Sequence, residues 1–315
     1  RCVAERGYGE GDMSEVMELA VGSLTHSARS RASAVIELCK PRVSAMVLAA
    51  TAVGFFMALS SPLDLRLSLL LFNTVVGTAL VAAGANAINQ YMEADFDARM
   101  ERTASRPIPS GRLSRGEALA FGLSSAVFGV AGLWALTGLV PAMVAATTFV
   151  TYVSAYTPLK RVTPLCVFVG AVPGALPPVI GWTAAGGTLD VGAFLLFSIV
   201  YFWQLPHFAA IAWQHREDYA RGGYPMLAVL DGDGSRTMLH VVTHSVGLVS
   251  ASVLPFVVGI AGSTYAVGAV LLGLAFFGSG CIFLSQKTPR AARIHVLASV
   301  VYLPLLLGLM LFDLV

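Results

Sequence analysis

The sequence predicts an all-α membrane protein in which nine transmembrane helices surround a central cavity. Hydrophobic residues make up 56% of the 315 positions and charged residues only 12%, whereas an ordinary soluble domain has about 25% charged residues. The mean hydropathy is +0.75. Nine apolar stretches are long enough to cross the ~30 Å hydrocarbon core of a bilayer. They lie near 43–60, 65–92, 115–137, 140–157, 164–184, 191–213, 237–260, 264–285 and 292–312.

The placement of Lys and Arg supports this count and predicts an orientation, because cationic residues are retained on the cytoplasmic side during insertion. With nine spans, the N-terminal segment and the loops after spans two, four, six and eight share one side. They hold 19 of the 20 Lys and Arg residues, and only Arg66 lies opposite. We therefore expect the N-terminus inside and the C-terminus outside. The net charge of +2 then reflects insertion and does not indicate nucleic-acid binding.

Two regions are expected along the chain. Residues 1–40 form a polar N-terminal tail, in which the stretch 30–42 is compatible with an interfacial helix. Residues 41–315 form the nine-helix membrane domain. The four cysteines lie far apart without a CxxC pair, so we expect no disulfide, zinc site or covalently attached haem.

The end of the second span carries the first candidate site. Asn89, Glu93 and Asp97 are spaced four residues apart, so they share one face of a helix. Such oxygen ligands suit Mg²⁺, which usually binds one or two carboxylates together with substrate phosphate oxygens. The alternative is a solvated loop, but acids beside a span are costly and contribute little to orientation.

Arg102, Arg106 and Arg112 are candidates among the arginines that follow these acids. Guanidinium groups match phosphate oxygens in a bidentate geometry, so acids followed by arginines indicate a diphosphate site. The alternative is that these arginines only obey the positive-inside bias and pair with the acids.

A second polar segment follows the sixth span on the same side. Asp218, with its neighbour Glu217, is a candidate for a second Mg²⁺, and Arg216 and Arg221 are candidates for phosphate contacts. Ordinary pairing between these acids and arginines is the alternative, because adjacent acids do not share one helix face.

Tyr156 and Lys160 end the fourth span between these two segments. Lys160 is suited to neutralise a phosphate, and Tyr156 to donate to one or to face a developing cation; interfacial anchoring is the alternative for both. The fifth span, 164–184, has enough Pro and Gly to be kinked or broken.

Trp203 and His207 lie within the sixth span, on either side of Gln204 and Pro206. An ionisable group at that depth is a functional candidate, and Trp203, one turn away, is placed to stack on a flat substrate. The alternative for His207 is a neutral imidazole bonded to a carbonyl freed by Pro206.

Several long, separated motifs closely resemble those of the protoheme IX farnesyltransferase family, the haem O synthases among the intramembrane aromatic prenyltransferases. The resemblance covers about residues 35–312. Its motifs are 89–103, 106–111, 156–161, 170–182, 203–208, 216–219 and 222–226.

The resemblance implies a nine-helix fold and an Mg²⁺-diphosphate role for Asn89, Glu93 and Asp97. It also implies phosphate contacts for Arg102, Arg106 and Lys160, and it places Asp218 in a second acidic motif. The chain departs from the wider superfamily, which commonly has Asp where this chain has Gln90 and Glu93, and spaces acids through the second motif where this chain has Gly222 and Gly223. These departures weaken the expectation of a complete second metal site.

The implied reaction transfers farnesyl from farnesyl diphosphate to a vinyl group of haem B, giving haem O. The cofactor would be Mg²⁺, and haem-A-pathway or terminal-oxidase assembly proteins are the partners to expect. Tyr156 and Trp203 would shield the farnesyl cation, and His207 would orient haem or ligate its iron. The location would be a bacterial plasma membrane, or the mitochondrial inner membrane in a eukaryote. A prenyltransferase for a quinone precursor and a membrane transporter are the alternatives.

Overall fold

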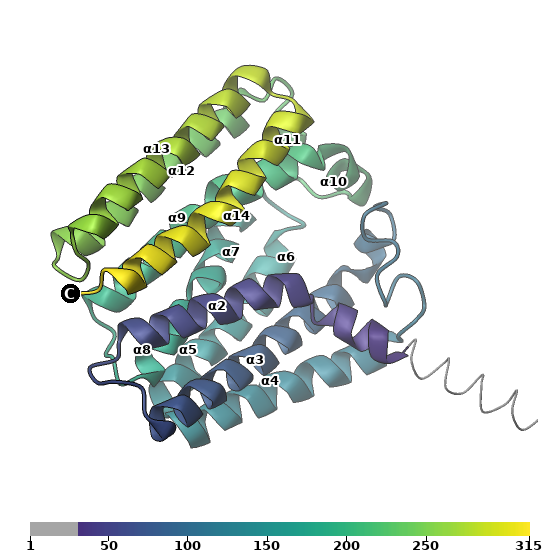
Figure 1. Ribbon diagram of the computed structural model, residues 1–315. Helices are drawn as coiled ribbons and strands as arrows, with labels where there is room; N and C mark the ends of the chain where they lie inside the picture. The colour runs from purple at the N-terminus through teal and green to yellow at the C-terminus, as the bar shows by residue number, and fades with distance from the viewer. Residues whose placement is uncertain (1–30) are drawn as a thin grey trace, which may run out of the picture.

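The computed structural model describes residues 31–315, which form α-helices and one π-helical turn but no β-strand (Figure 1). In this part of the chain, eight spans are long and apolar enough to cross a membrane. The count is nine if the bent pair Arg31–Leu38 and Pro41–Met57 forms one further span. The predicted all-α multispan class is confirmed. Residues 1–30 of the predicted N-terminal tail lie outside the described residues.

Nine helical rods account for nearly all of the described chain, and two of them are built from consecutive shorter pieces. Leu139–Leu159 comprises α5, η1 and α6, and Cys166–Ala184 comprises α7 and α8. The elements are α2 (Pro41–Met57), α3 (Leu65–Asp97), α4 (Arg115–Thr137), α5 (Leu139–Val150), the π-helical η1 (Thr151–Tyr156), α6 (Thr157–Leu159), α7 (Cys166–Ala175), α8 (Pro177–Ala184), α9 (Val191–Gln214), α10 (Arg216–Gly222), α11 (Leu227–Leu230), α12 (Ser235–Val257), α13 (Ser263–Gln286) and α14 (Pro289–Phe312).

The apolar residues of these helices face outward as well as inward. Phe72, Phe128 and Leu271 are each more than 60% exposed. Helices that are hydrophobic all round are typical of membrane spans, where lipid covers the outward side chains. The multi-pass membrane location therefore follows from the surface as well as from the composition.

Glycines allow α2 and α8 to pack with their backbones in close contact. A Cβ on Gly181 would lie 1.8 Å from the Thr51 carbonyl oxygen, and one on Gly54 would lie 1.9 Å from that of Pro178. Small residues permit such approach between transmembrane helices. The predicted break in the fifth span is confirmed, because α7 and α8 are separated at Leu176, directly before two prolines that have no amide hydrogen to donate.

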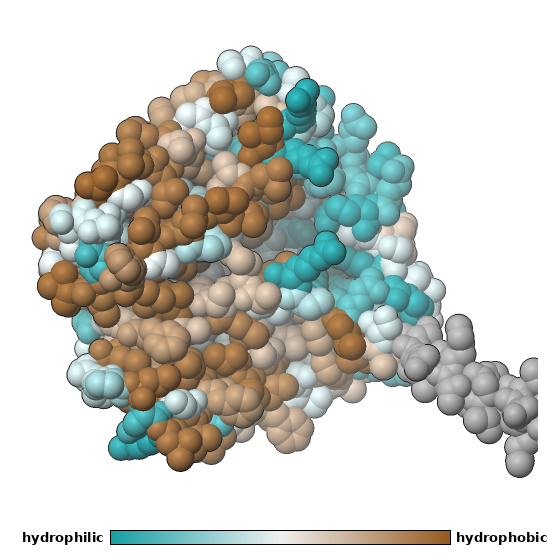
Figure 2. Space-filling model, viewed as in Figure 1, coloured by the Kyte–Doolittle hydropathy of each residue, from teal (hydrophilic) through white to brown (hydrophobic). Residues whose placement is uncertain are grey.

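The connections that follow α3, α6 and α9 meet at one end of the bundle, which we call the polar end. Figure 2 shows hydrophilic residues gathered on the side where Figure 1 places α10 and the loop after α3, while the rest of the visible surface is mainly hydrophobic. The surface is also hollowed between α2 and α14 in this view. The candidate site lies at the polar end.

Candidate active site

One face of the last turns of α3 forms the base of the site. Asn89, Glu93 and Asp97 are 3%, 1% and 0% exposed, and their spacing places them along one face. The sequence-based expectation of a shared face is therefore met. Two carboxylates buried this deeply need compensating partners.

Each carboxylate has a cationic partner from a different connection. Lys160 Nζ lies 3.0 Å from both carboxylate oxygens of Glu93. Arg106 Nη1 lies 2.6 Å from Asp97 Oδ2. Of the predicted phosphate-binding residues, Lys160 and Arg106 are thus brought directly to the acids.

Lys40 is a third basic residue at this site, and no sequence motif singles it out. Burial, with repulsion from Arg106, lowers its pKa to about 7, and a bound anion would favour its charged form. Its Nζ donates to Asn89 Oδ1 at 3.0 Å, while Asn89 Nδ2 donates to Thr157 Oγ1 at 3.2 Å. From the sequence alone, this lysine counts only toward the positive-inside bias. The sequence feature that could have pointed to Lys40 is its position directly before Pro41, at the start of the first span.

The backbone around Lys40 is fixed by α3. The helix Arg31–Leu38 ends there and meets α2 at 47°, with Lys40 in the left-handed region at φ 49°. Gln90 Nε2 donates to the Leu38 carbonyl at 2.8 Å, and Asn86 Nδ2 to the Cys39 carbonyl at 3.3 Å. These bonds satisfy helix-end carbonyls that would otherwise lack partners, so α3 itself positions the lysine.

Aromatic rings line the site beside the cations. Tyr156, at the end of η1, lies 5.2 Å from Tyr152 between ring centroids. A Cβ on Gly170 would lie 2.4 Å from the Tyr156 ring, so this glycine makes room for the tyrosine. Lys160 Nζ lies 4.6 Å from the centroid of the Tyr224 ring, within the range of a cation–π contact.

Asp218 joins the connection after α9 to the loop after α3. Its oxygens accept from the amides of Glu101 at 2.9 Å and Arg102 at 3.2 Å, and from Arg221 Nη2 at 2.9 Å. Burial opposes ionisation, but these hydrogen bonds outweigh it and lower the pKa of Asp218. Its predicted metal role stays a prediction; the contacts observed are those of a clamp between two loops.

The remaining arginines take different positions. Arg102 lies over the Tyr219 ring at 5.7 Å, and Arg221 pairs with Glu101 at 3.3 Å as well as with Asp218. Arg112 bonds Glu37 at 2.7 Å and the Ser105 carbonyl at 2.6 Å. The pairs Arg221–Asp218 and Arg106–Asp97 are those that the alternative interpretation of these arginines expects. Glu37, the partner of Arg112, belongs to neither acidic segment.

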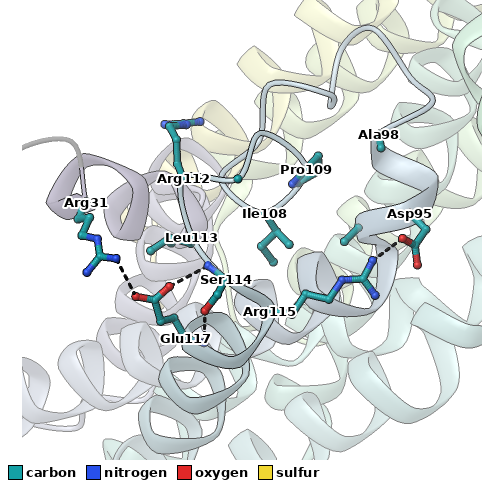
Figure 3. A pocket seen from close by; sticks show the side chains of 12 residues that line it. Arg31, Asp95, Ala98, Ile108, Pro109, Arg112, Leu113, Ser114, Arg115 and Glu117 are labelled. Carbon is teal, nitrogen blue, oxygen red and sulfur yellow. Dashed lines mark hydrogen bonds and ion pairs between the residues drawn. The ribbon is translucent and has the colours of Figure 1, made fainter. Parts of the chain in front are cut away.

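Arg112 also lines a separate pocket beside the helix Arg31–Leu38. Figure 3 shows this pocket, in which Arg115 pairs with Asp95, and Arg31 with Glu117. Asp95 is an exposed acid of α3. In the described residues, none of the contacts of Arg112 is to Glu93 or Asp97.

Trp203 and His207 bind α14. Their rings stack at 5.0 Å with an interplanar angle of 17°. Trp203 Nε1 donates to the Ser299 carbonyl at 2.7 Å, and His207 Nδ1 lies 2.5 Å from Ser299 Oγ. His207 is therefore held by a serine hydroxyl, and its substrate role stays a prediction.

The donor set at the α3 face fits Mg²⁺. In residues 31–315, no three or more His, Cys, Asp and Glu side chains converge to hold a metal by themselves. The face offers two carboxylates and an amide oxygen, and Asp97 Oδ1 is buried without a hydrogen-bond partner in the part of the chain that the structure describes. Mg²⁺ suits such a site, because it usually takes its other ligands from water and substrate phosphate.

Comparison with known proteins identifies the family of this site. The model of the UbiA prenyltransferase family matches residues 47–307. The chain belongs to the UbiA prenyltransferase family. It is a prenyltransferase of the membrane. A protoheme IX farnesyltransferase of Solibacter usitatus is 44% identical over 287 residues, covering 88% of this chain and 97% of that protein.

Solved structures of UbiA prenyltransferases share the fold. A digeranylgeranylglyceryl phosphate synthase superposes with a TM-score of 0.74 at 17% identity, covering 90% of this chain and 98% of that one. A UbiA homologue from Archaeoglobus fulgidus, bound to GPP and Mg²⁺, superposes with a TM-score of 0.62 at 14% identity, covering 88% and 99% of the two chains.

Proposed function

We propose that this prenyltransferase transfers farnesyl from farnesyl diphosphate to a vinyl group of haem B, giving haem O and inorganic pyrophosphate. One structural observation carries the diphosphate half of the proposal: Lys40, Lys160 and Arg106 meet the buried oxygens of α3 at a single place. The name of the Solibacter usitatus relative supports the farnesyl donor and the haem acceptor.

The cations would assist departure of the diphosphate. As the allylic C–O bond breaks, its electron pair stays on the diphosphate oxygen, and negative charge grows there. Fixed cations aimed at developing charge in a site with little water are among the largest contributions to catalysis. Lys160 and Arg106 would exchange carboxylate oxygens for phosphate oxygens when the substrate binds.

Asn89, Glu93 and Asp97 would hold Mg²⁺. The ion would neutralise phosphate charge and orient the leaving group. The A. fulgidus structure with GPP and Mg²⁺ supports metal use in this fold. Asp218 remains a weaker candidate for a second ion, because both of its oxygens already accept hydrogen bonds.

The acceptor half of the reaction uses the apolar part of the site. The farnesyl cation adds to the terminal vinyl carbon, water then adds to the cation left beside the porphyrin ring, and loss of one proton gives the hydroxyethylfarnesyl group. Tyr156 and Trp203 would shield the cations by their faces, and His207 would orient haem. Water must stay away from the first cation, which a lipid-enclosed site favours.

Mass spectrometry of the haem product tests this proposal. Purified protein incubated with haem B, farnesyl diphosphate and Mg²⁺ should form haem O, whereas 4-hydroxybenzoate should remain unprenylated. Asp97→Asn should lower turnover about 100-fold, as does loss of one preorganised group in other enzymes, and Asp95→Asn should not. Prenylation of 4-hydroxybenzoate instead of haem would favour the quinone-precursor alternative, and solute flux in liposomes without any prenyl product would favour a transporter.

A further inference from the structure

We propose that Tyr224 is a further catalytic residue, whose hydroxyl donates a hydrogen bond to the diphosphate group as it departs. The inference rests on the proposed function and adds a neutral donor to its three cations. It is carried by a buried phenol that lies beside Asn89, Glu93 and Asp97, here called the acid cluster, and whose hydroxyl has no hydrogen-bond partner within residues 31–315.

The ring of Tyr224 is fixed on several sides. The residue lies between α10 and α11 and is 1% exposed. Its ring centroid is 5.3 Å from that of Phe96 and 4.6 Å from Lys160 Nζ. Because the same ammonium lies 3.0 Å from both oxygens of Glu93, the phenol ring and the α3 face share one cation.

The short connection before Tyr224 is shaped to hold it there. Gly223 adopts φ +75°, which favours glycine, and the Tyr224 amide donates to the Tyr219 carbonyl at 2.9 Å. A Cβ on Gly222 would lie 2.8 Å from Met100 Cγ, so a side chain there would press on the loop after α3. Gly222 and Gly223 occupy positions in the second motif through which the wider superfamily spaces its acids. In this chain they allow Tyr224 to lie beside the acid cluster.

The hydroxyl of Tyr224 meets no hydrogen-bond partner from the described residues. Within residues 31–315 it is buried and bonds to nothing, an arrangement that costs folding free energy. Burial raises the pKa of Tyr224, and the negative charges of Glu93 and Asp97 raise it further. The phenol therefore keeps its proton and remains a donor.

Two further buried polar atoms, one in the acid cluster and one on Arg161, also have no hydrogen-bond partner among the described residues. Asp97 Oδ1 lacks a donor or a cation, and Arg161 Nε lacks an acceptor, among the described residues. A ligand that combines a divalent cation with an oxyanion supplies both kinds of missing partner: a cation for a carboxylate oxygen such as Asp97 Oδ1, and an acceptor for a donor such as the Tyr224 hydroxyl. A metal diphosphate has this chemistry, and an apolar porphyrin edge does not.

Replacement of Tyr224 by Phe tests the proposal because it keeps the ring and removes only the hydroxyl. Three quantities should be measured: the thermal midpoint, the affinity for inorganic pyrophosphate with Mg²⁺, and kcat with farnesyl diphosphate and haem B. We expect an equal or higher thermal midpoint, because a buried unpartnered group is removed. We also expect roughly tenfold weaker pyrophosphate binding and a lower kcat, because a hydrogen bond to a charged acceptor is lost.

Tyr91→Phe is the matched control, since Tyr91 lies on another face of α3 and packs against a separate apolar cluster that includes Ala34 and Leu38. It should change neither pyrophosphate affinity nor kcat. Unchanged affinity and kcat in Tyr224→Phe would overturn the inference, as would losses that only follow a lowered thermal midpoint. If the unaltered protein fails to bind pyrophosphate with Mg²⁺, the proposed function fails and takes this inference with it.

Discussion

Lys40 connects the start of the first span to the acid cluster through one hydrogen bond to Asn89. Replacing it with Met should weaken binding of farnesyl diphosphate about tenfold, because a charge-assisted contact is worth 1.5–3 kcal/mol. The measurement is the KM for farnesyl diphosphate in purified protein. Arg42→Met removes the same charge from an exposed position two residues away. Equal effects of the two substitutions would show that only the overall charge of the polar end matters.

For single residues, the sequence predicts which ones share a helix face. It does not predict which ones are brought together by tertiary packing. Asn89, Glu93 and Asp97 could be grouped because helical periodicity alone aligns them. Lys40 reaches Asn89 across 49 residues of sequence, and no local pattern contains that contact. Arg112 resembles Arg106 in sequence, but it binds Glu37 on a different helix.

Asp218, in α10, joins the connection after α9 to the loop after α3 by hydrogen bonds. Asp218→Ala should speed hydrogen–deuterium exchange at the amides of Glu101 and Arg102, because both lose their acceptor. Mass spectrometry of the peptide after α3 measures this exchange. The exposed neighbour Glu217 provides the control, Glu217→Ala. Unchanged exchange together with a raised Mg²⁺ requirement would instead support the predicted metal role.

Close packing of α2 on α8 should make Gly181 intolerant of any side chain. Gly181→Ala places a Cβ 1.8 Å from the Thr51 carbonyl, and overpacking of this kind costs about 1–3 kcal/mol. Gly278→Ala in α13 meets nothing within 4 Å, so it should be neutral or stabilise by up to about 1 kcal/mol. Thermal unfolding in detergent compares the two variants, and equal midpoints would contradict the close approach.

The break between α7 and α8 was predictable because composition marks it: Pro177 and Pro178 begin α8. The π-helical turn η1 was not predicted, because no residue of Thr151–Tyr156 distinguishes it from an α-helix. Its physical reason lies just beyond it. Pro158 has no amide hydrogen, so it cannot donate to the carbonyl four residues earlier, as an α-helix requires. The Thr157 amide instead donates to the Tyr152 carbonyl, five residues earlier, which gives the wider π-helical turn.

The bundle as a whole should lie with its polar end in the cytoplasm, as the distribution of Lys and Arg predicts. The test uses a variant without native cysteines, carrying one new cysteine at the exposed position Ala104 or Ser61. A membrane-impermeant maleimide should label Ala104→Cys only in inverted vesicles. It should label Ser61→Cys, between α2 and α3, only from outside. The reverse pattern would contradict the orientation.

The three cations around the α3 face also have a consequence for turnover. Inorganic pyrophosphate carries more negative charge than farnesyl diphosphate. Lys40, Lys160 and Arg106 would therefore bind this product more tightly than they bind the substrate. When pyrophosphate accumulates, it would compete with farnesyl diphosphate for these side chains, so the reaction would be inhibited by its own product. In the cell, enzymes that hydrolyse free pyrophosphate would relieve this inhibition, because they would prevent the product from rebinding.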